Sequence, residues 1–106
     1  MIVHIKKHNY PSPDGSKHSR MFIPGEKYQY VDFAILKQEM CAYMWECEGN
    51  GKFFLAELER YAGNRGYQLT IPTVLNKRLV RILERNGYTM RAIRYYGYIC
   101  ELWSKW

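Results

Sequence analysis

The hydrophobic residues are spaced most regularly in the second half of the chain. Over residues 53–62 they recur every three or four positions, which predicts an amphipathic helix. The polar, glycine-flanked run 63–66 is expected to end that helix, and the alternating run 67–71 predicts a short strand. A second amphipathic pattern from about residue 74 to residue 86, closed by Gly87, predicts another helix.

The first half has a weaker pattern. Residues 1–6 alternate as a strand does, residues 11–16 form a turn-rich loop, and residues 21–23 fit a further short strand. Residues 28–37 are ambiguous, because their apolar side chains fit both the strand period and the helix period. Residues 40–47 are expected to form the strand that leads into the second half.

The last segment, residues 89–106, predicts two strands around Tyr95, Tyr96 and Gly97. It is rich in aromatic residues, which favour strands and pack well on a sheet. We therefore interpret these rings as sheet packing. Stacking on nucleic-acid bases is the alternative.

A glycine loop precedes the first predicted helix. Gly49 and Gly51 let the backbone approach a ligand closely, because neither residue carries a Cβ atom. The helix start behind them offers unpaired N–H groups and the positive end of the helix dipole. This arrangement indicates an anion-binding site.

These residues resemble the GNAT superfamily, the acyl-CoA-dependent N-acyltransferases. The family's pyrophosphate loop reads Arg/Gln-x-x-Gly-x-Gly/Ala and is followed by a helix of pattern Leu-Leu-x-x-Leu-x-x-x-Ala. The corresponding residues here are Glu46, Gly49 and Gly51, and then Phe54, Leu55, Leu58 and Ala62. The family's later Asn and its apolar helix ending in Gly-Phe match Asn76, Leu79, Ile82, Leu83, Gly87 and Tyr88.

The resemblance implies an α+β (α/β) fold with a mixed, mostly antiparallel central sheet and helices on both faces, formed by residues 1–106 as one domain. Family members spend more residues ahead of the glycine loop, so the N-terminal helices that grip the acceptor are expected to be short or absent. An open acceptor groove of this kind fits a macromolecular acceptor.

The resemblance also implies acetyl-CoA as cosubstrate. A backbone N–H in the range 41–44 would polarise the thioester, the glycine loop would hold the pyrophosphate, and Asn76 would bond the pantetheine amides. The expected cofactor-binding residues are Cys41, Met44, Glu46, Gly49, Asn50, Gly51, Lys52, Phe53 and Asn76.

The catalytic candidates are Glu39, Tyr88 and Tyr96, with Glu46 as a second choice for the base. Glu39 is the expected base, with Glu46 behind it, although Glu39 fits a surface charge equally well. Many family members protonate the leaving thiolate with a Tyr, and Leu83 occupies that position here. Tyr88 and Tyr96 are the nearest hydroxyl groups in the sequence, and water is the alternative.

Composition and charge narrow the class of protein. The chain has 106 residues, of which 47% are hydrophobic, enough for one core. A net charge of +6 indicates an anionic partner, which coenzyme A, a nucleic acid and an acidic protein would all satisfy. Lys77, Arg81 and Arg85 fall on one face of the second helix, which we interpret as a solvated face rather than a specific nucleic-acid surface.

Compartment and metal binding follow from the remaining residue types. We expect a cytoplasmic protein, because no run is apolar enough to span a bilayer or to serve as a secretory signal, and three cysteines do not form a paired framework. His4 and His8 are four residues apart, but this spacing does not bring side chains together on a strand. His18, Cys41 and Cys47 are of residue types that could serve as further ligands. Because the sequence contains no Cys-x-x-Cys pair, no metal site is expected.

Three functions are compatible with these observations. The first is an acetyl-CoA-dependent N-acetyltransferase that acts on an amine, in particular on a protein. The second is a degenerate relative that keeps the fold and serves as a binding or inhibitory module. The third is a basic nucleic-acid-associated protein.

Overall fold

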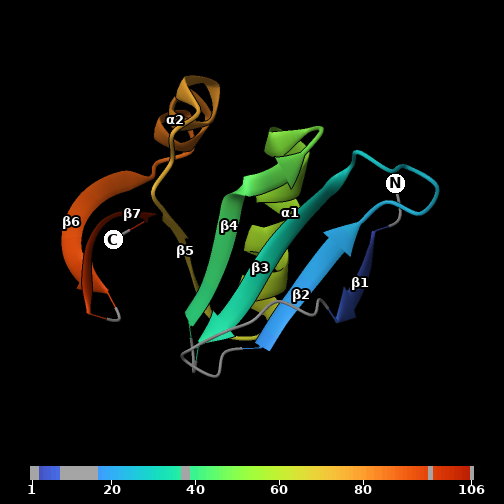
Figure 1. Ribbon diagram of the computed structural model, residues 1–106, viewed down its shortest axis with the longest axis horizontal. Helices are drawn as coiled ribbons and strands as arrows, with labels where there is room; N and C mark the ends of the chain where they lie inside the picture. Colours follow the sequence, from blue (N-terminus) through green and yellow to red (C-terminus); the bar gives the residue numbers. More distant parts are fainter. Residues whose placement is uncertain (1–2, 8–16, 37–38, 96, 106) are drawn as a thin grey trace.

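The structure, a computed structural model, describes residues 3–7, 17–36, 39–95 and 97–105. For residues 17, 39, 41–48, 95 and 98 the description covers the backbone alone. The elements follow in the order β1 (His4–Lys7), β2 (Lys17–Phe22), β3 (Tyr30–Leu36), β4 (Glu39–Glu48), α1 (Gly51–Asn64), β5 (Gln68–Pro72), α2 (Lys77–Arg85), β6 (Thr89–Tyr95) and β7 (Tyr98–Ser104) (Figure 1).

The strands form one sheet in the order β1-β2-β3-β4-β5-β7-β6. Every neighbouring pair is antiparallel except β4 and β5, which are parallel. The connection between these two parallel strands passes through α1, because parallel neighbours need a crossover. The expected class, a mixed and mostly antiparallel sheet with helices, is confirmed.

The ambiguous segment 28–37 is resolved as strand β3. It pairs with β2 on one side and with β4 on the other, so both rows of its backbone groups are used. Residues 31–34 are all buried, although successive side chains of a strand point to opposite faces. A segment that is covered on both faces loses the clean alternation that identifies a strand in a sequence.

Both predicted helices form, with bounds set by their caps. Asn50 caps α1 by accepting a hydrogen bond from the Phe53 N–H, and the helix buries the predicted apolar stripe Phe54, Leu55, Leu58 and Ala62. Helix α2 starts at Lys77, later than residue 74, because the Asn76 side chain accepts from the amides of Arg78 and Leu79. An Asn with extended backbone is a strong N-cap, and it fixes the helix start there.

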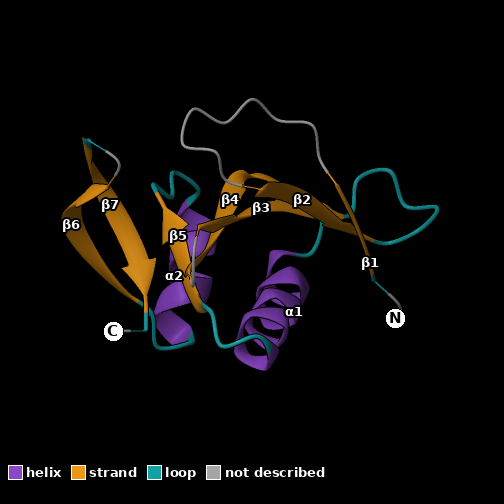
Figure 2. Ribbon diagram, turned by 90° about the horizontal axis from the view of Figure 1, so that it is seen from below, coloured by secondary structure: helices purple, strands orange, loops and turns teal. Residues whose placement is uncertain are grey.

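Both helices lie on the same side of the sheet (Figure 2). Their buried residues Leu58 and Leu83 belong to the same core cluster as Met21, Val31 and Phe33 of the sheet. The arrangement differs from the expected helices on both faces, since no helix of the described residues covers the opposite face. The segment that joins β1 to β2, residues 8–16, includes the predicted loop 11–16 and lies outside the described residues.

The predicted C-terminal hairpin is confirmed. Strands β6 and β7 pair from Thr89 opposite Ser104 to Tyr95 opposite Tyr98. Gly97 takes a φ of 85° in the turn between them, a conformation that favours glycine. The hairpin extends the sheet beyond β5 through the pairing of Ile71 with Trp103.

Candidate functional site

The two parallel strands β4 and β5 are paired over only a short length. Their register runs from Glu39 opposite Gln68 to Cys41 opposite Thr70, and the buried Thr70 hydroxyl donates a hydrogen bond of 3.4 Å to the Met40 carbonyl. Beyond that point β4 continues to Glu48 without pairing to β5, and Figure 1 shows the two strands diverging toward the start of α1. The backbone of β4 therefore offers hydrogen-bonding groups on its β5 side that the sheet does not use.

A second irregularity lies in the same part of β4. Tyr43 pairs with Asp32 and Glu48 pairs with Tyr30, so residues 44–47 of β4 face only Val31 of β3. This bulge bends the strand and leaves its extra residues out of the regular ladder. Met44 and Glu46, two of the predicted cofactor-binding residues, lie in this bulge, and Cys41 lies at the last position of β4 that pairs with β5.

The glycine loop follows the bulge directly. Gly49 has a φ of 91°, which disfavours any residue with a Cβ. A Cβ atom at Gly49 would collide with the Gln29 side chain and lie 2.7 Å from the Tyr28 carbonyl oxygen. Position 49 thus requires glycine, because its φ is positive and because the turn that contains Tyr28 and Gln29 packs against it.

Two of the predicted phosphate-binding amides already have partners within the protein. The Asn50 N–H donates to Gln29 Oε1 at 3.1 Å, and the Phe53 N–H donates to Asn50 Oδ1 at 3.0 Å. The first amides of a helix have no partner in the helix itself. Among the described residues, the amides of Gly51 and Lys52 also have no hydrogen-bond partner outside the helix.

The electrostatics of the loop favour an anion. The first turn of α1 contains no acidic residue that would neutralise the positive end of the helix dipole, and the exposed Lys52 adds a positive charge there. Among the described side chains, a Cβ atom built on Gly51 would meet only Leu79 Cδ1, at 3.9 Å, so the first turn of α2 lies beside the first turn of α1.

Asn76 directly precedes this first turn of α2. Its side-chain oxygen is engaged as the N-cap of α2, accepting from the Arg78 N–H at 2.9 Å and from the Leu79 N–H at 3.3 Å. The first turn of α2 also lacks an acidic residue. Two helix starts without an acidic residue in their first turns, together with Lys52 and Arg78, thus lie at the end where β4 and β5 diverge.

The predicted catalytic residues are not all placed at this end. The backbone of Glu39 lies at the opposite, paired end of β4, and its side chain is outside the described part of the chain. Tyr96 is outside it altogether. Leu83 is fully buried in the core on α2, where it serves as packing.

Tyr88 belongs to a cluster at the far end of α1. It is buried and, with Glu59 and Gly63, lines a small cavity of about 170 Å³. Burial raises the pKa of its phenol well above the ordinary value, and the charge and hydrogen bond of Glu59 raise that pKa further. Lys105 bonds Glu59 at 2.6 Å and lies 5.2 Å from the centre of the Tyr88 ring. A phenol held protonated in this cluster is not positioned beside the glycine loop.

Gln29 is the residue of this site that the sequence did not indicate. It comes 21 positions before Asn50 and belongs to no motif. The turn of residues 23–29 holds it in place through hydrogen bonds from the Gln29 N–H to the Glu26 carbonyl and from the Ile23 N–H to the Gln29 carbonyl. The long-range contact could be found only from the fold.

Neither a metal centre nor a membrane segment is found where the structure gives information. Over the described ranges, no three His, Cys, Asp or Glu side chains are grouped closely enough to hold a metal ion. No helix of those ranges combines the length and the apolar character needed to span a bilayer.

The comparisons with known proteins agree with the geometry of the fold. No family model matches the sequence, and no curated protein matches it significantly. The structure is similar to the crystal structure of a GNAT family acetyltransferase from Elizabethkingia anophelis with acetyl-CoA bound. The match has a TM-score of 0.53 and 13% identity, and it covers 96% of this chain and 94% of the other. The chain therefore has the fold of the GNAT acetyltransferases.

Proposed function

We propose that the protein is an acetyl-CoA-dependent N-acetyltransferase that acts on an amine of a protein. The observation that carries the proposal is the divergence of β4 from β5 after Cys41, next to two helix starts that contain no acidic residue in their first turns. This combination offers unused backbone donors to a thioester and positive potential to a polyanionic cosubstrate.

The pyrophosphate would bind at the start of α1. The amides of Gly51 and Lys52 would donate to it, and the Lys52 ammonium would compensate part of its charge. The Asn50 amide would join them only if Gln29 withdraws, because it now donates to that side chain. Asn76 uses its side-chain oxygen as a cap, so its NH₂ group is the part that would serve the pantetheine arm.

The chemical step is the attack of a neutral amine on the thioester carbonyl. The amine nitrogen forms the new C–N bond, the carbonyl oxygen gains charge in the tetrahedral intermediate, and the C–S bond then breaks. Backbone N–H groups of β4 from Cys41 onward would stabilise the oxygen. Glu39, whose backbone lies in the paired part of β4 two residues before Cys41, is the proposed base and would act through water, with Glu46 as the second candidate.

Protonation of the leaving thiolate has no obvious side-chain donor in the described residues. Leu83 is core, and the Tyr88 phenol is engaged with Glu59. Tyr96 or a water molecule would supply the proton. The assignment predicts that turnover does not depend on Tyr88.

A protein acceptor is favoured by the exposed polar end of the sheet face opposite α1. Lys6, Glu26 and Lys27 are exposed there, whereas Asp32 and Ala34 further along β3 are buried. No described helix lies over that end, so a segment of another protein can approach it (Figure 2).

Acetyl transfer can be tested directly. The protein is incubated with acetyl-CoA and a panel of proteins, lysine peptides and small amines, and acetylation is followed by mass spectrometry together with release of the free thiol. We expect transfer that is lost in Gly51→Val and retained when Lys77, Arg81 and Arg85 are all replaced by Gln. Binding of acetyl-CoA without transfer to any acceptor would instead identify a degenerate binding module.

A further inference from the structure

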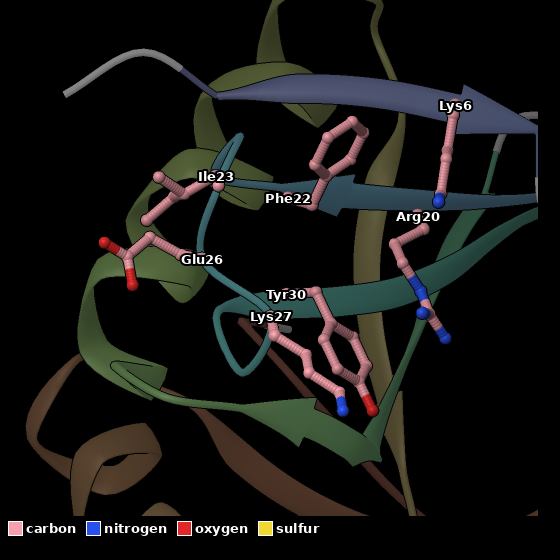
Figure 3. A pocket seen from close by; sticks show the side chains of 8 residues that line it. Lys6, Arg20, Phe22, Ile23, Glu26, Lys27 and Tyr30 are labelled. Atoms are coloured by element: carbon pink, nitrogen blue, oxygen red, sulfur yellow. The ribbon is translucent and has the colours of Figure 1, made fainter.

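A second polar site lies on the sheet face opposite the helices. It is a cavity of about 370 Å³ over the ends of β1, β2 and β3, at the turn that follows β2. Alternate residues of a strand point to opposite faces, and Met21 and Val31 point into the core, so Arg20 and Tyr30 point to the other face. Figure 3 shows the lining side chains, which include Lys6, Arg20, Phe22, Glu26, Lys27 and Tyr30.

The floor of this cavity is rigid. Arg20 Nε lies 2.7 Å from Asp32 Oδ1, and Arg20 Nη2 lies 3.0 Å from Asp32 Oδ2. The two side chains thus form a bidentate ion pair, in which the carboxylate is almost fully buried. The Arg20 guanidinium also stacks on the Tyr30 ring, 4.0 Å from its centre. The guanidinium is therefore held in one position, with its charge largely balanced by Asp32.

The rim of the cavity carries the net charge. Lys6 and Lys27 are both exposed, and their ammonium groups lie 5.1 Å and 5.4 Å from the centres of the Phe22 and Tyr28 rings. Glu26 supplies one negative charge on the same rim. Among the described side chains of the rim, and with Arg20 paired to Asp32, the two lysines exceed Glu26 by one positive charge.

We infer that this cavity binds the carboxylate of an acidic residue in the protein acceptor, close in sequence to the amine that is acetylated. The inference rests on the proposed function and defines its substrate class. A carboxylate carries the single negative charge that the rim lacks, and the rings of Phe22 and Tyr30 cover the apolar part of an Asp or Glu side chain. Glu26 opposes a ligand with several charges, such as a nucleic acid.

The position of the cavity sets the spacing of the acidic residue. The cavity lies over β2 and β3, and the opening where acetyl transfer is proposed lies between β4 and β5. Adjacent strands are about 4.8 Å apart, so the two sites are separated by roughly two spacings, or about 10 Å. An extended peptide covers that distance in about three residues.

The turn of residues 23–29 joins the two sites. Glu26 and Lys27 line the cavity, and Gln29 in the same turn accepts the Asn50 amide of the glycine loop. The acidic residue of an acceptor would therefore bind next to the loop that holds the cosubstrate. This proximity supports one continuous acceptor path over the sheet.

The test uses fluorescence anisotropy of labelled lysine peptides with the full chain in the absence of acetyl-CoA. One peptide carries Glu about three residues from the lysine, and the others carry Gln or Lys at that position. We expect the Glu peptide to bind roughly threefold to tenfold more tightly than the Gln peptide. The double variant Lys6→Glu, Lys27→Glu should reverse the preference toward the Lys peptide, and Lys6→Gln, Lys27→Gln, which leaves only Glu26 charged, should reverse it more weakly.

The matched control is Lys7→Glu, which changes the same charge on the same strand outside the cavity and should keep the preference for Glu. Equal binding of the three peptides by the wild type, or a preference that survives the double charge reversal, would overturn the inference. So would a labelled RNA oligonucleotide that binds more tightly than the Glu peptide and depends on Lys6 and Lys27. None of these results depends on acetyl transfer, so failure of the acetylation assay is recognised separately.

Discussion

The backbone amide of Asn50 donates a hydrogen bond to the side chain of Gln29, with 3.1 Å between Asn50 N and Gln29 Oε1. The amide oxygen of Gln29 thus occupies one of the donors at which the cosubstrate's phosphate is proposed to bind. The same side chain lies where a Cβ atom on Gly49 would be. Gln29 therefore shapes the glycine loop and competes with the phosphate for one of its amides.

Charge at position 29 should separate these two roles. In Gln29→Glu a carboxylate would still accept from Asn50 and would stabilise the positive end of α1 by about 0.3–1 kcal/mol. It would also repel the pyrophosphate, so we expect acetyl-CoA affinity to fall while resistance to urea rises. Gln29→Ala is the control: it should lower stability by about 0.5–1.5 kcal/mol and, because it frees the Asn50 amide, raise the affinity for acetyl-CoA above that of the wild type. A loss of affinity that is equal in both variants would contradict competition at this amide.

The phosphate site itself is best tested at Gly51. Gly49 is unsuitable, because its φ of 91° and its contact with Gln29 would make any side chain disturb the fold. A Cβ atom at Gly51 meets only an ordinary contact at 3.9 Å, so Gly51→Val should fold. Its branched side chain would fill the space next to the Gly51 and Lys52 amides, and we expect acetyl-CoA binding to be lost in calorimetry. The smaller Gly51→Ala should retain weakened binding; wild-type affinity in the Val variant would rule out this site.

Glu46 places a carboxylate where the family favours Arg or Gln. Its backbone lies in the bulge of β4, three residues before Gly49. A carboxylate within about 6 Å of a pyrophosphate is repulsive, and salt reduces this repulsion. We therefore expect Glu46→Arg to tighten acetyl-CoA binding, and more so at low salt. Weaker binding in that variant would show that Glu46 serves another group and that the loop is aligned incorrectly with the family.

The pKa of Tyr88 predicts a dependence of stability on pH. The folded protein raises the pKa of this phenol, through burial first and Glu59 second, whereas the unfolded chain has the ordinary value of about 10. Folding thus favours the neutral phenol. The stabilising contribution of the neutral Tyr88 phenol to the free energy of unfolding is fully present below about pH 10 and is lost as the pH rises above that value.

Urea unfolding between pH 8 and about pH 11 measures this effect. Tyr88→Phe should lower stability at pH 8 by about 1 kcal/mol, because the hydrogen bond to Glu59 is lost, and should weaken the decline at high pH. Tyr28→Phe, at an exposed tyrosine, should reproduce the wild-type profile. If stability falls with pH as steeply in Tyr88→Phe as in the wild type, the ionisation of Tyr88 is not coupled to unfolding.

The sequence predicted the second half of the fold well, because its signals are local. The stripe Phe54, Leu55, Leu58 and Ala62 depends only on the helix period, and the turn at Gly97 depends on one glycine between two alternating runs. Segment 28–37 stayed ambiguous because burial on both faces of β3 removes the alternation. Its structure is decided by its pairing with β2 and β4, which is distant in sequence.

In the candidate site too, some features could be predicted from local sequence and others depend on contacts that are distant in sequence. The glycine spacing and the capping role of Asn50 can be read locally, and α2, which Asn76 caps, begins beside the first turn of α1. Gln29 could not be predicted, because its bond to Asn50 spans 21 residues and no motif contains it. Tyr88 was predicted near the cosubstrate from its distance in sequence, but Glu59 and Lys105 hold it at the other end of α1.

Isothermal titration with acetyl-CoA and with free coenzyme A tests the central claim most directly. We expect saturable, equimolar binding of both ligands by the wild type, weaker at high salt because phosphate contacts dominate, and no heat of binding with Gly51→Val. The triple replacement of Lys77, Arg81 and Arg85 by Gln should bind as the wild type does. The absence of binding to the folded wild type, or binding of equal strength to Gly51→Val, would contradict an acyl-CoA site at the start of α1.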